Sequence, residues 1–237
     1  MDSLAAAWRL LLSFDPDLIE IVGLSLRVSL MAVFLAALVA LPVGAALALH
    51  RFPGRRAVII LLDAFMGLPP VVVGLVVYMA LAHQGPLGGL GWLFTPRAMI
   101  LAQMLLVLPI LAALTRQSIA DEWEVVGEQL RSFGVSRMRA IPTLLWDGRY
   151  RLVTTLLAGF GRAIAEVGAV LIVGGNIAHV TRVMTTAITL ETSKGDLTLA
   201  LGLGIVLILL AIAVNALAHA IRYAEQRLAK PAPGVGR

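Results

Sequence analysis

The sequence lacks cysteine altogether and is poor in charged residues, which make up only 14% of its 237 positions. Without cysteine the chain can form no disulfide bond, no thiolate metal site and no cysteine nucleophile. Its 4 histidines are scattered and do not have the spacing of metal ligands. It contains no glycine-rich phosphate-binding loop ending in Lys and Ser or Thr, and no nucleophile can be paired with a general base. We therefore expect that the chain is not an enzyme and carries no cofactor or metal itself.

Long apolar stretches are the main feature that the sequence does contain. Apolar residues account for 59% of the chain, and the mean hydropathy is +0.92. They gather in five stretches, at about 21–49, 57–82, 98–114, 152–173 and 197–218. A helix that crosses a bilayer needs about 20 mostly apolar residues, so four stretches are long enough and the third becomes so with its flanks. The sequence predicts an all-α integral membrane protein with five transmembrane helices.

The basic residues are distributed unevenly between the two sides that five spans would create. Thirteen of the 19 lie in segments 50–56, 115–151 and 219–237, and only four lie in the opposite set of segments. Because short cytoplasmic loops are enriched in Lys and Arg, we expect the N-terminus outside and the C-terminus in the cytoplasm. The net charge of +5 then reflects membrane topology and is no evidence of nucleic-acid binding.

The two ends of the chain lie outside the apolar stretches. Residues 1–20 contain Trp8 within an apolar run that is too short to span a membrane and lacks the features of a signal peptide, so we expect an external interfacial helix. Residues 21–220 are expected to form the transmembrane domain, and residues 221–237 a cytoplasmic tail. No separate soluble domain is expected.

The most polar segment lies between the third and fourth spans, at about 116–151. Its acidic residues precede Arg131, which is the order that the helix dipole favours. Gly134 is placed to end this helix with a positive φ, and Ser136 is placed to cap a second short helix that carries Arg137. The pattern predicts two short helices joined at a glycine and facing the cytoplasm, although a solvated surface loop would share it.

This polar segment also resembles a known family. Glu128, followed by Gly134 and an apolar stretch, is similar to the EAA loop of permease subunits of ATP-binding cassette importers. The resemblance covers about residues 20–220. Segments 51–56, 67–74, 85–91 and 161–169 resemble molybdate-type permeases, and segments 174–177, 181–188 and 191–196 are most similar to tungstate permeases.

The resemblance implies an importer-permease core that moves tungstate across the bacterial plasma (inner) membrane. It implies a homodimer around a central path, two ATP-binding subunits that hold ATP and magnesium, and an external solute-binding protein. It also implies that the loop couples to the ATPase, through Glu128, Arg131, Phe133, Gly134 and Arg137. The alternatives are a molybdate or sulfate permease of the same type and, from a different class, an ATP-independent anion channel or carrier.

Four residues within the spans are candidates for a gate or a translocation path. Arg162 and Glu166 lie four positions apart on one face of the expected fourth helix, where charges are costly enough to be functional candidates. They could form a latch that changes partners or a static pair that neutralises two charges. Pro69 and Pro70 remove two backbone donors within the second span, which predicts a gating bend or a packing kink. Asp63 is expected as an interface charge close to the arginines just before that span.

The segment 174–196 is too polar to span, and the charge pattern places it outside. It is rich in hydrogen-bond donors, namely Asn176, Thr181, Arg182, Thr185 and Thr186. A tetrahedral oxyanion only accepts hydrogen bonds, so these donors suit an anion path. They would equally suit docking of the external binding protein, or the capping of a short helix from about Thr181 to Leu190.

Overall fold

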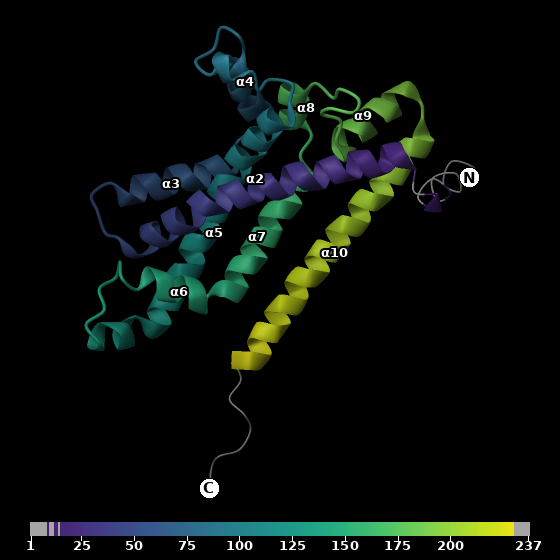
Figure 1. The fold of residues 1–237 in the computed structure, drawn as a ribbon. Helices are drawn as coiled ribbons and strands as arrows, with labels where there is room; N and C mark the ends of the chain where they lie inside the picture. Colours follow the sequence, from purple (N-terminus) through teal and green to yellow (C-terminus); the bar gives the residue numbers. More distant parts are fainter. Residues whose placement is uncertain (1–8, 10–11, 14, 230–237) are drawn as a thin grey trace.

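The computed structural model describes residue 9, residues 12–13 and residues 15–229, and every regular element within these ranges is helical, as Figure 1 shows. The predicted all-α class is therefore confirmed for the described part of the chain. The elements are α2 (Pro16–Leu49), α3 (Arg55–Met66), α4 (Pro70–Leu81), the 3-10 turn η1 (Gly88–Leu90), α5 (Pro96–Ser132), α6 (Ile141–Asp147), α7 (Arg149–Ile164), α8 (Gly168–Gly174), α9 (Met184–Lys194) and α10 (Leu197–Ala229).

Three of these helices, α2, α5 and α10, are long and apolar enough to cross a membrane as single spans. Two further pairs have the length and composition of a span but bend at a short break. The bend is 100° between α3 and α4, and 60° between α7 and α8. The helices thus supply three spans, or five if each bent pair counts as one.

The first long helix begins earlier than the sequence predicts. The Asp15 side chain caps α2 by accepting hydrogen bonds from the backbone N–H groups of Asp17 and Leu18, both at 3.1 Å. Pro16 occupies the first helical position, where its missing donor costs nothing. Residues 16–20 therefore belong to the first long helix and not to a separate interfacial helix. Most of the predicted interfacial helix lies outside the described residues.

The third span is much longer than predicted. Helix α5 runs for 37 residues and continues past the apolar stretch without a break, because no proline interrupts the chain between Pro109 and Pro142. At 1.5 Å per residue its length is about 55 Å, well beyond a bilayer core of about 30 Å. The first of the two predicted short loop helices was wrong as a separate element, since it is the projecting end of α5.

Small residues allow the central helices to pack closely. Helix α2 packs along α5 more extensively than any other pair of helices does. A Cβ added at Gly44 of α2 would lie 2.5 Å from the carbonyl oxygen of Ala112 on α5. Ala36 and Ala40 of α2 are completely buried in the same core. Helices in lipid associate through such close contacts, because lipid tails are as apolar as the side chains.

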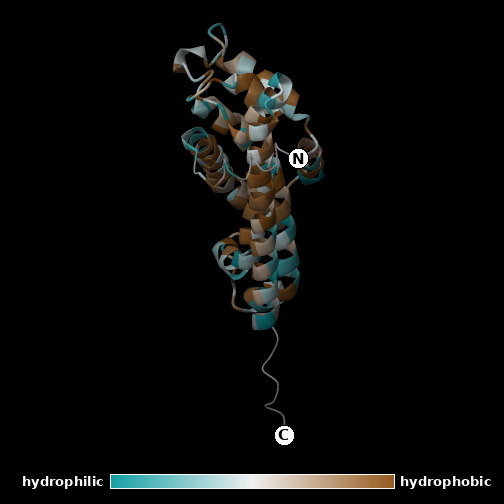
Figure 2. Cartoon of the chain, turned by 90° about the vertical axis from the view of Figure 1, so that its right-hand side faces the viewer, coloured by the Kyte–Doolittle hydropathy of each residue, from teal (hydrophilic) through white to brown (hydrophobic). Residues whose placement is uncertain are grey.

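Two helices leave most of their apolar surface uncovered. No residue of α3 is buried, and the span of α10 is the least buried of the three long ones. Figure 2 shows hydrophobic colour along much of the bundle. Such surfaces suit contact with lipid or with another subunit. Helix α10 also continues to Ala229, so residues 221–229 of the predicted tail are helical, and residues 230–237 lie outside the described chain.

The second halves of the two bent pairs pack against each other. A Cβ added at Gly74 of α4 would lie 2.7 Å from Cα of Ala169 on α8, and one added at Gly168 would lie 2.9 Å from Cγ2 of Val71. Because Val71 and Gly168 immediately follow the two breaks, the breaks lie side by side. The arrangement needs glycine at both contacts.

Replacing Gly74 with alanine should separate α4 from α8. The new methyl group would meet the α8 backbone, which cannot rotate away, so we expect a loss of about 1–3 kcal/mol in stability, as is usual for overpacking. Thermal unfolding of the purified protein in detergent would measure this. Gly23→Ala is the control, since a Cβ there has no neighbour within 4 Å. Equal melting temperatures for the two variants would contradict the prediction.

Candidate translocation and coupling sites

The bend in the second span lies where the sequence places it. Helix α3 ends at Gly67, whose N–H bonds the carbonyl of Ala64 at 3.1 Å. Pro69 is extended, and Pro70 begins α4. The carbonyl of Pro69 accepts from the N–H groups of Val72 and Val73, so the new helix starts with its donors satisfied. The prolines act as a helix start in mid-span, which explains the 100° change of direction.

The bend in the fourth span was not predicted. Helix α7 ends at Ile164 and α8 begins at Gly168, so Glu166 lies in the break between them. The expectation that Arg162 and Glu166 share one face of a continuous helix was therefore wrong. Nothing between these residues is a strong helix breaker; the close approach of Gly168 to Val71 is a tertiary contact that local sequence does not reveal.

Arg162 and Glu166 nevertheless form an ion pair. Nη1 of Arg162 lies 2.6 Å from Oε2 of Glu166, whose side chain is almost fully buried, while about a third of the Arg162 side chain is exposed. The other carboxylate oxygen accepts from the N–H of Ala169 in the first turn of α8 at 3.2 Å. The backbone carbonyl of Glu166 accepts from the Thr185 hydroxyl at 2.7 Å. Glu166 is thus held from three directions.

Gln103 is a further polar residue at this break that the sequence reasoning missed. Its side chain is buried on α5, and Nε2 donates a 3.0 Å hydrogen bond to the carbonyl of Ala163 at the end of α7. Its Oε1 is buried with no partner in the described chain. A single glutamine in an apolar stretch is the signal that could have found it, because buried polar groups in a membrane need partners.

Most of the hydrogen-bond donors predicted in segment 174–196 are used within the segment, apart from the Thr185 hydroxyl, which bonds Glu166. Thr181 Oγ1 donates to the carbonyl of Gly174 at 2.6 Å and accepts from the N–H of Ile177 at 3.0 Å. Thr186 exchanges hydrogen bonds with the backbone of Val183, and Asn176 Nδ2 donates to the carbonyl of Thr186 at 3.2 Å. The short helix predicted from about Thr181 to Leu190 is α9, which begins at Met184 and ends at Lys194. It begins later than predicted because Thr181 bonds the loop that precedes the helix.

A histidine joins this segment to the start of α2. Nδ1 of His179 lies 2.9 Å from Oε2 of Glu20. Hydrogen bonding and charge attraction from Glu20 raise the pKa of His179 above its ordinary value. Arg182 lines the same shallow pocket, together with Asp17. The pair connects two segments that are distant in sequence, although both side chains are exposed.

At the opposite end of the bundle, the predicted glycine turn is confirmed. Gly134 has φ +74°, its N–H bonds the carbonyl of Arg131 at 2.9 Å, and the next N–H bonds the carbonyl of Leu130 at 3.0 Å. The guanidinium groups of Arg131 and Arg137 lie 5.5 and 5.9 Å from the centre of the Trp123 ring. The turn therefore has a fixed shape at the tip of α5.

The second helix of this loop begins later than predicted. Residues 137–140 form turns, and α6 starts at Ile141 with Pro142 in its first turn, so Ser136 does not cap it. Leu144 of α6 is completely buried against α2 and α5. Trp146 is 70% exposed and Phe133 is 73% exposed. The end of α5 and the anchored helix α6 thus each present one large apolar side chain to the surroundings.

Asp63 does not have the partner that the sequence suggested. Asp63 lies 3.9 Å from Arg116 of α5 and does not pair with Arg55 or Arg56, the first two residues of α3. Arg55 instead donates to the carbonyls of Leu47 and Ala48 at the end of α2, at 2.8 and 3.2 Å. The arginine satisfies helix-terminal carbonyls that have no partner within their own helix.

No family model matches the chain, but several curated proteins align along most of its length. The tungstate uptake system permease protein TupB of Peptoclostridium acidaminophilum is 39% identical over 92% of this chain and 95% of its own. The TupB of Campylobacter jejuni is 36% identical over 93% and 92%. A probable anion ABC transporter permease of Haloferax volcanii is 41% identical over 86% and 90%.

The candidate spans of the helical bundle give the structure the character of a membrane protein. The extent of these alignments defines the class further: the chain belongs to the family of anion permeases of ATP-binding cassette transporters.

Replacing Arg162 with glutamine should destabilise the protein, because Glu166 would remain buried without its counter-charge. We expect a loss of about 1–3 kcal/mol, and a smaller loss in the double variant Arg162→Gln/Glu166→Gln, which removes both charges. Thermal unfolding in detergent gives the comparison. Arg27→Gln is the control, since Arg27 has no ion-pair partner among the described residues. Equal losses in the single and double variants would show that the pair is not coupled.

Proposed function

We propose that the chain is the membrane-spanning permease of an ATP-binding cassette importer that carries tungstate into the cytoplasm. The observation that carries the proposal is the alignment, over nine-tenths of the chain, with two permeases named for tungstate uptake. The two adjacent helix breaks and the anchored helix at the far end of α5 are the structural features that such a permease needs.

The proposed topology has five spans, with each bent pair counted as one and the N-terminus outside. It places α9 outside and α6 in the cytoplasm, at the two opposite ends seen in Figure 1. The excess of Arg and Lys in the segments beside α6 supports this orientation. The protein is then a multi-pass component of the plasma membrane.

Coupling to ATP hydrolysis is proposed at the α5–α6 turn. Exposed Glu128 and Phe133, with Arg131, Gly134 and Arg137 around them, would enter a cleft of the partner ATPase, which holds the ATP and magnesium. The shape of the turn and its exposed Phe133 and Trp146 support an interface there, because large apolar side chains in water favour a protein partner. In this proposal the chain itself hydrolyses nothing.

The translocation path is proposed along the two breaks. Pro69, Pro70, Arg162 and Glu166 lie at neighbouring bends, and backbone breaks at membrane depth are tolerated where they are buried or line a cavity. A second copy of the chain would complete the path, with the exposed apolar surfaces of α3 and α10 available for partner or lipid. The segment 174–196 would form the face that docks an external solute-binding protein. An anion path is less favoured there, because the donors of Asn176, Thr181, Thr185 and Thr186 already bond the backbone; Arg182 belongs to the same face.

Uptake by reconstituted vesicles tests the function. The vesicles would contain the permease and the ATPase encoded beside it, with the neighbouring binding protein outside. We expect tungstate to accumulate only when ATP is present on the cytoplasmic side. Preference for molybdate or sulfate would correct the substrate and keep the class. Flux that is independent of ATP would overturn the proposal in favour of a channel or carrier.

Gly134→Pro should abolish ATP-dependent uptake while leaving membrane insertion intact, because proline can neither adopt the positive φ nor donate the bond to Arg131. Gly91→Pro is a matched control. Gly91 also has a positive φ, donates a backbone hydrogen bond and faces open space, but lies at the other end of the bundle. Each change should cost about 1–3 kcal/mol locally. Normal uptake by Gly134→Pro, or equal loss in both variants, would contradict the coupling role.

A further inference from the structure

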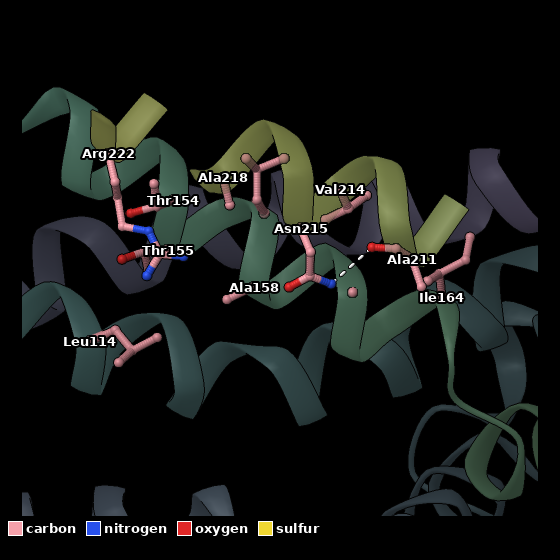
Figure 3. Close-up of a pocket in the computed structure, with 12 residues that line it drawn as sticks. Leu114, Thr154, Thr155, Ala158, Ile164, Ala211, Val214, Asn215, Ala218 and Arg222 are labelled. Carbon is pink, nitrogen blue, oxygen red and sulfur yellow. Dashed lines mark hydrogen bonds between the residues drawn. The ribbon is translucent and has the colours of Figure 1, made fainter. Parts of the chain in front are cut away.

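A groove opens between α5, α7 and α10, near the end of the bundle where α10 terminates. Its volume is about 480 Å³. The floor is apolar, and the polar lining residues are Thr154, Thr155, Asn215 and Arg222. Figure 3 shows Arg222 reaching from α10 toward Thr154 and Thr155 of α7, with Asn215 farther along the groove. Among the described residues that line it, none is acidic.

Thr154 donates its hydroxyl proton to the carbonyl of Arg151 at 2.7 Å, but Thr155 and Asn215 keep unused capacity to donate hydrogen bonds. Thr155 is only 6% exposed, yet its hydroxyl has no hydrogen-bond partner in the part of the chain that the structure describes. Asn215 donates one Nδ2 proton to the carbonyl of Ala211 at 2.8 Å, which leaves its second proton free. Unlike Oε1 of Gln103, the Thr155 hydroxyl is not sealed from solvent, so it is open to the groove and free to donate to a ligand there.

The charge of Arg222 is also uncompensated. Within the described chain this guanidinium has no ion pair, and it lies at the mouth of the groove. Arg151, on the neighbouring turn of α7, shows the contrast, because it pairs with Glu225 at 3.0 Å and with Glu122 at 3.6 Å. Arg151 engages both Glu122 and Glu225, which leaves Arg222 as the one charged side chain that lines the groove in the described chain.

We propose that this groove is a binding site for a tetrahedral oxyanion, held by the Arg222 guanidinium and the Thr155 hydroxyl, with Asn215 deeper in the groove. All three groups donate, and a guanidinium with hydroxyl neighbours is the donor set that oxyanions favour. This inference rests on the proposed function, in which the groove would receive tungstate on its way to the cytoplasm. The phosphate of a lipid headgroup has the same chemistry and is the second possible source of the ligand.

The absence of cysteine from the natural chain makes the groove directly accessible to experiment. Ala158 lines the groove and is exposed, so Ala158→Cys would introduce a unique reporter thiol. The full chain, with its ATPase, would be reconstituted in vesicles of phosphatidylcholine alone. An anionic and a cationic methanethiosulfonate reagent would then be applied from the cytoplasmic side. We expect faster labelling by the anionic reagent, and slower labelling when millimolar tungstate is added.

Arg222→Gln in this background should weaken protection by tungstate about tenfold, the effect of losing one charge-assisted hydrogen bond, and should remove the preference for the anionic reagent. Thr155→Val should also weaken protection while keeping the charge preference. Arg227→Gln is the matched control, because Arg227 lies on the same end of α10 but bonds Tyr223 and does not line the groove. It should leave both readouts unchanged.

The same labelling in vesicles that contain phosphatidylglycerol distinguishes the two sources. Protection by the anionic lipid that requires Arg222 would support the oxyanion site with lipid phosphate as its ligand, whereas protection by tungstate in phosphatidylcholine would support it with the transported ion. No protection by either, or protection that survives Arg222→Gln, would overturn the inference. ATP-dependent tungstate uptake by the same vesicles is measured in parallel, so a failed groove and a failed transport proposal give different results.

Discussion

The contact between α4 and α8 holds the two helix breaks side by side, and the proposed transport path depends on it. A broken helix in a bilayer exposes backbone groups that lipid cannot satisfy, so each break must be buried and bonded. Here Gly74 lets α8 approach α4, and the break in the fourth span is then bonded from two other helices. Gln103 of α5 donates to the carbonyl of Ala163, and Thr185 of α9 donates to that of Glu166. The bend is therefore a packed element and not a loose hinge.

Helix α5 connects this region to the α5–α6 turn. Gln103, at the break, and Trp123, beside the turn, belong to the same uninterrupted helix. A movement applied at the turn would therefore reach the break through one continuous helix and would not depend on a chain of loop contacts. Leu144 fixes α6 against the same helix. This gives a physical route for coupling in which the break and the turn are both bonded to one helix.

Much of this architecture is predictable from local sequence, and its failures have specific causes. The bend at Pro69–Pro70 and the turn at Gly134 were predicted because proline and positive-φ glycine impose their own backbone geometry. The break near Glu166 was missed because no strong helix breaker marks it, and its contacts with Val71, Gln103 and Thr185 come from distant parts of the sequence. The full length of α5 was not predicted, because the apolar stretch ends near residue 114 whereas the helix continues to Ser132. The hydroxyl groups near Thr181 suited an anion path, a docking face or local helix capping equally, because sequence does not distinguish an outward donor from one bonded to its own backbone.

A conduit must not bind its anion tightly, and the distribution of charge along the proposed path fits this requirement. An arginine free at mid-membrane would bind an oxyanion strongly in a medium of low dielectric constant and would not release it. Arg162 is instead neutralised by Glu166, whose carboxylate also accepts from the N–H of Ala169. Arg162 is therefore not free to hold an anion at the centre of the path. Arg222, which lacks a carboxylate partner in the described chain, lies beyond the apolar stretch, where water screens it. Attraction at the end and neutrality in the middle would let an anion leave toward the cytoplasm without being trapped on the way.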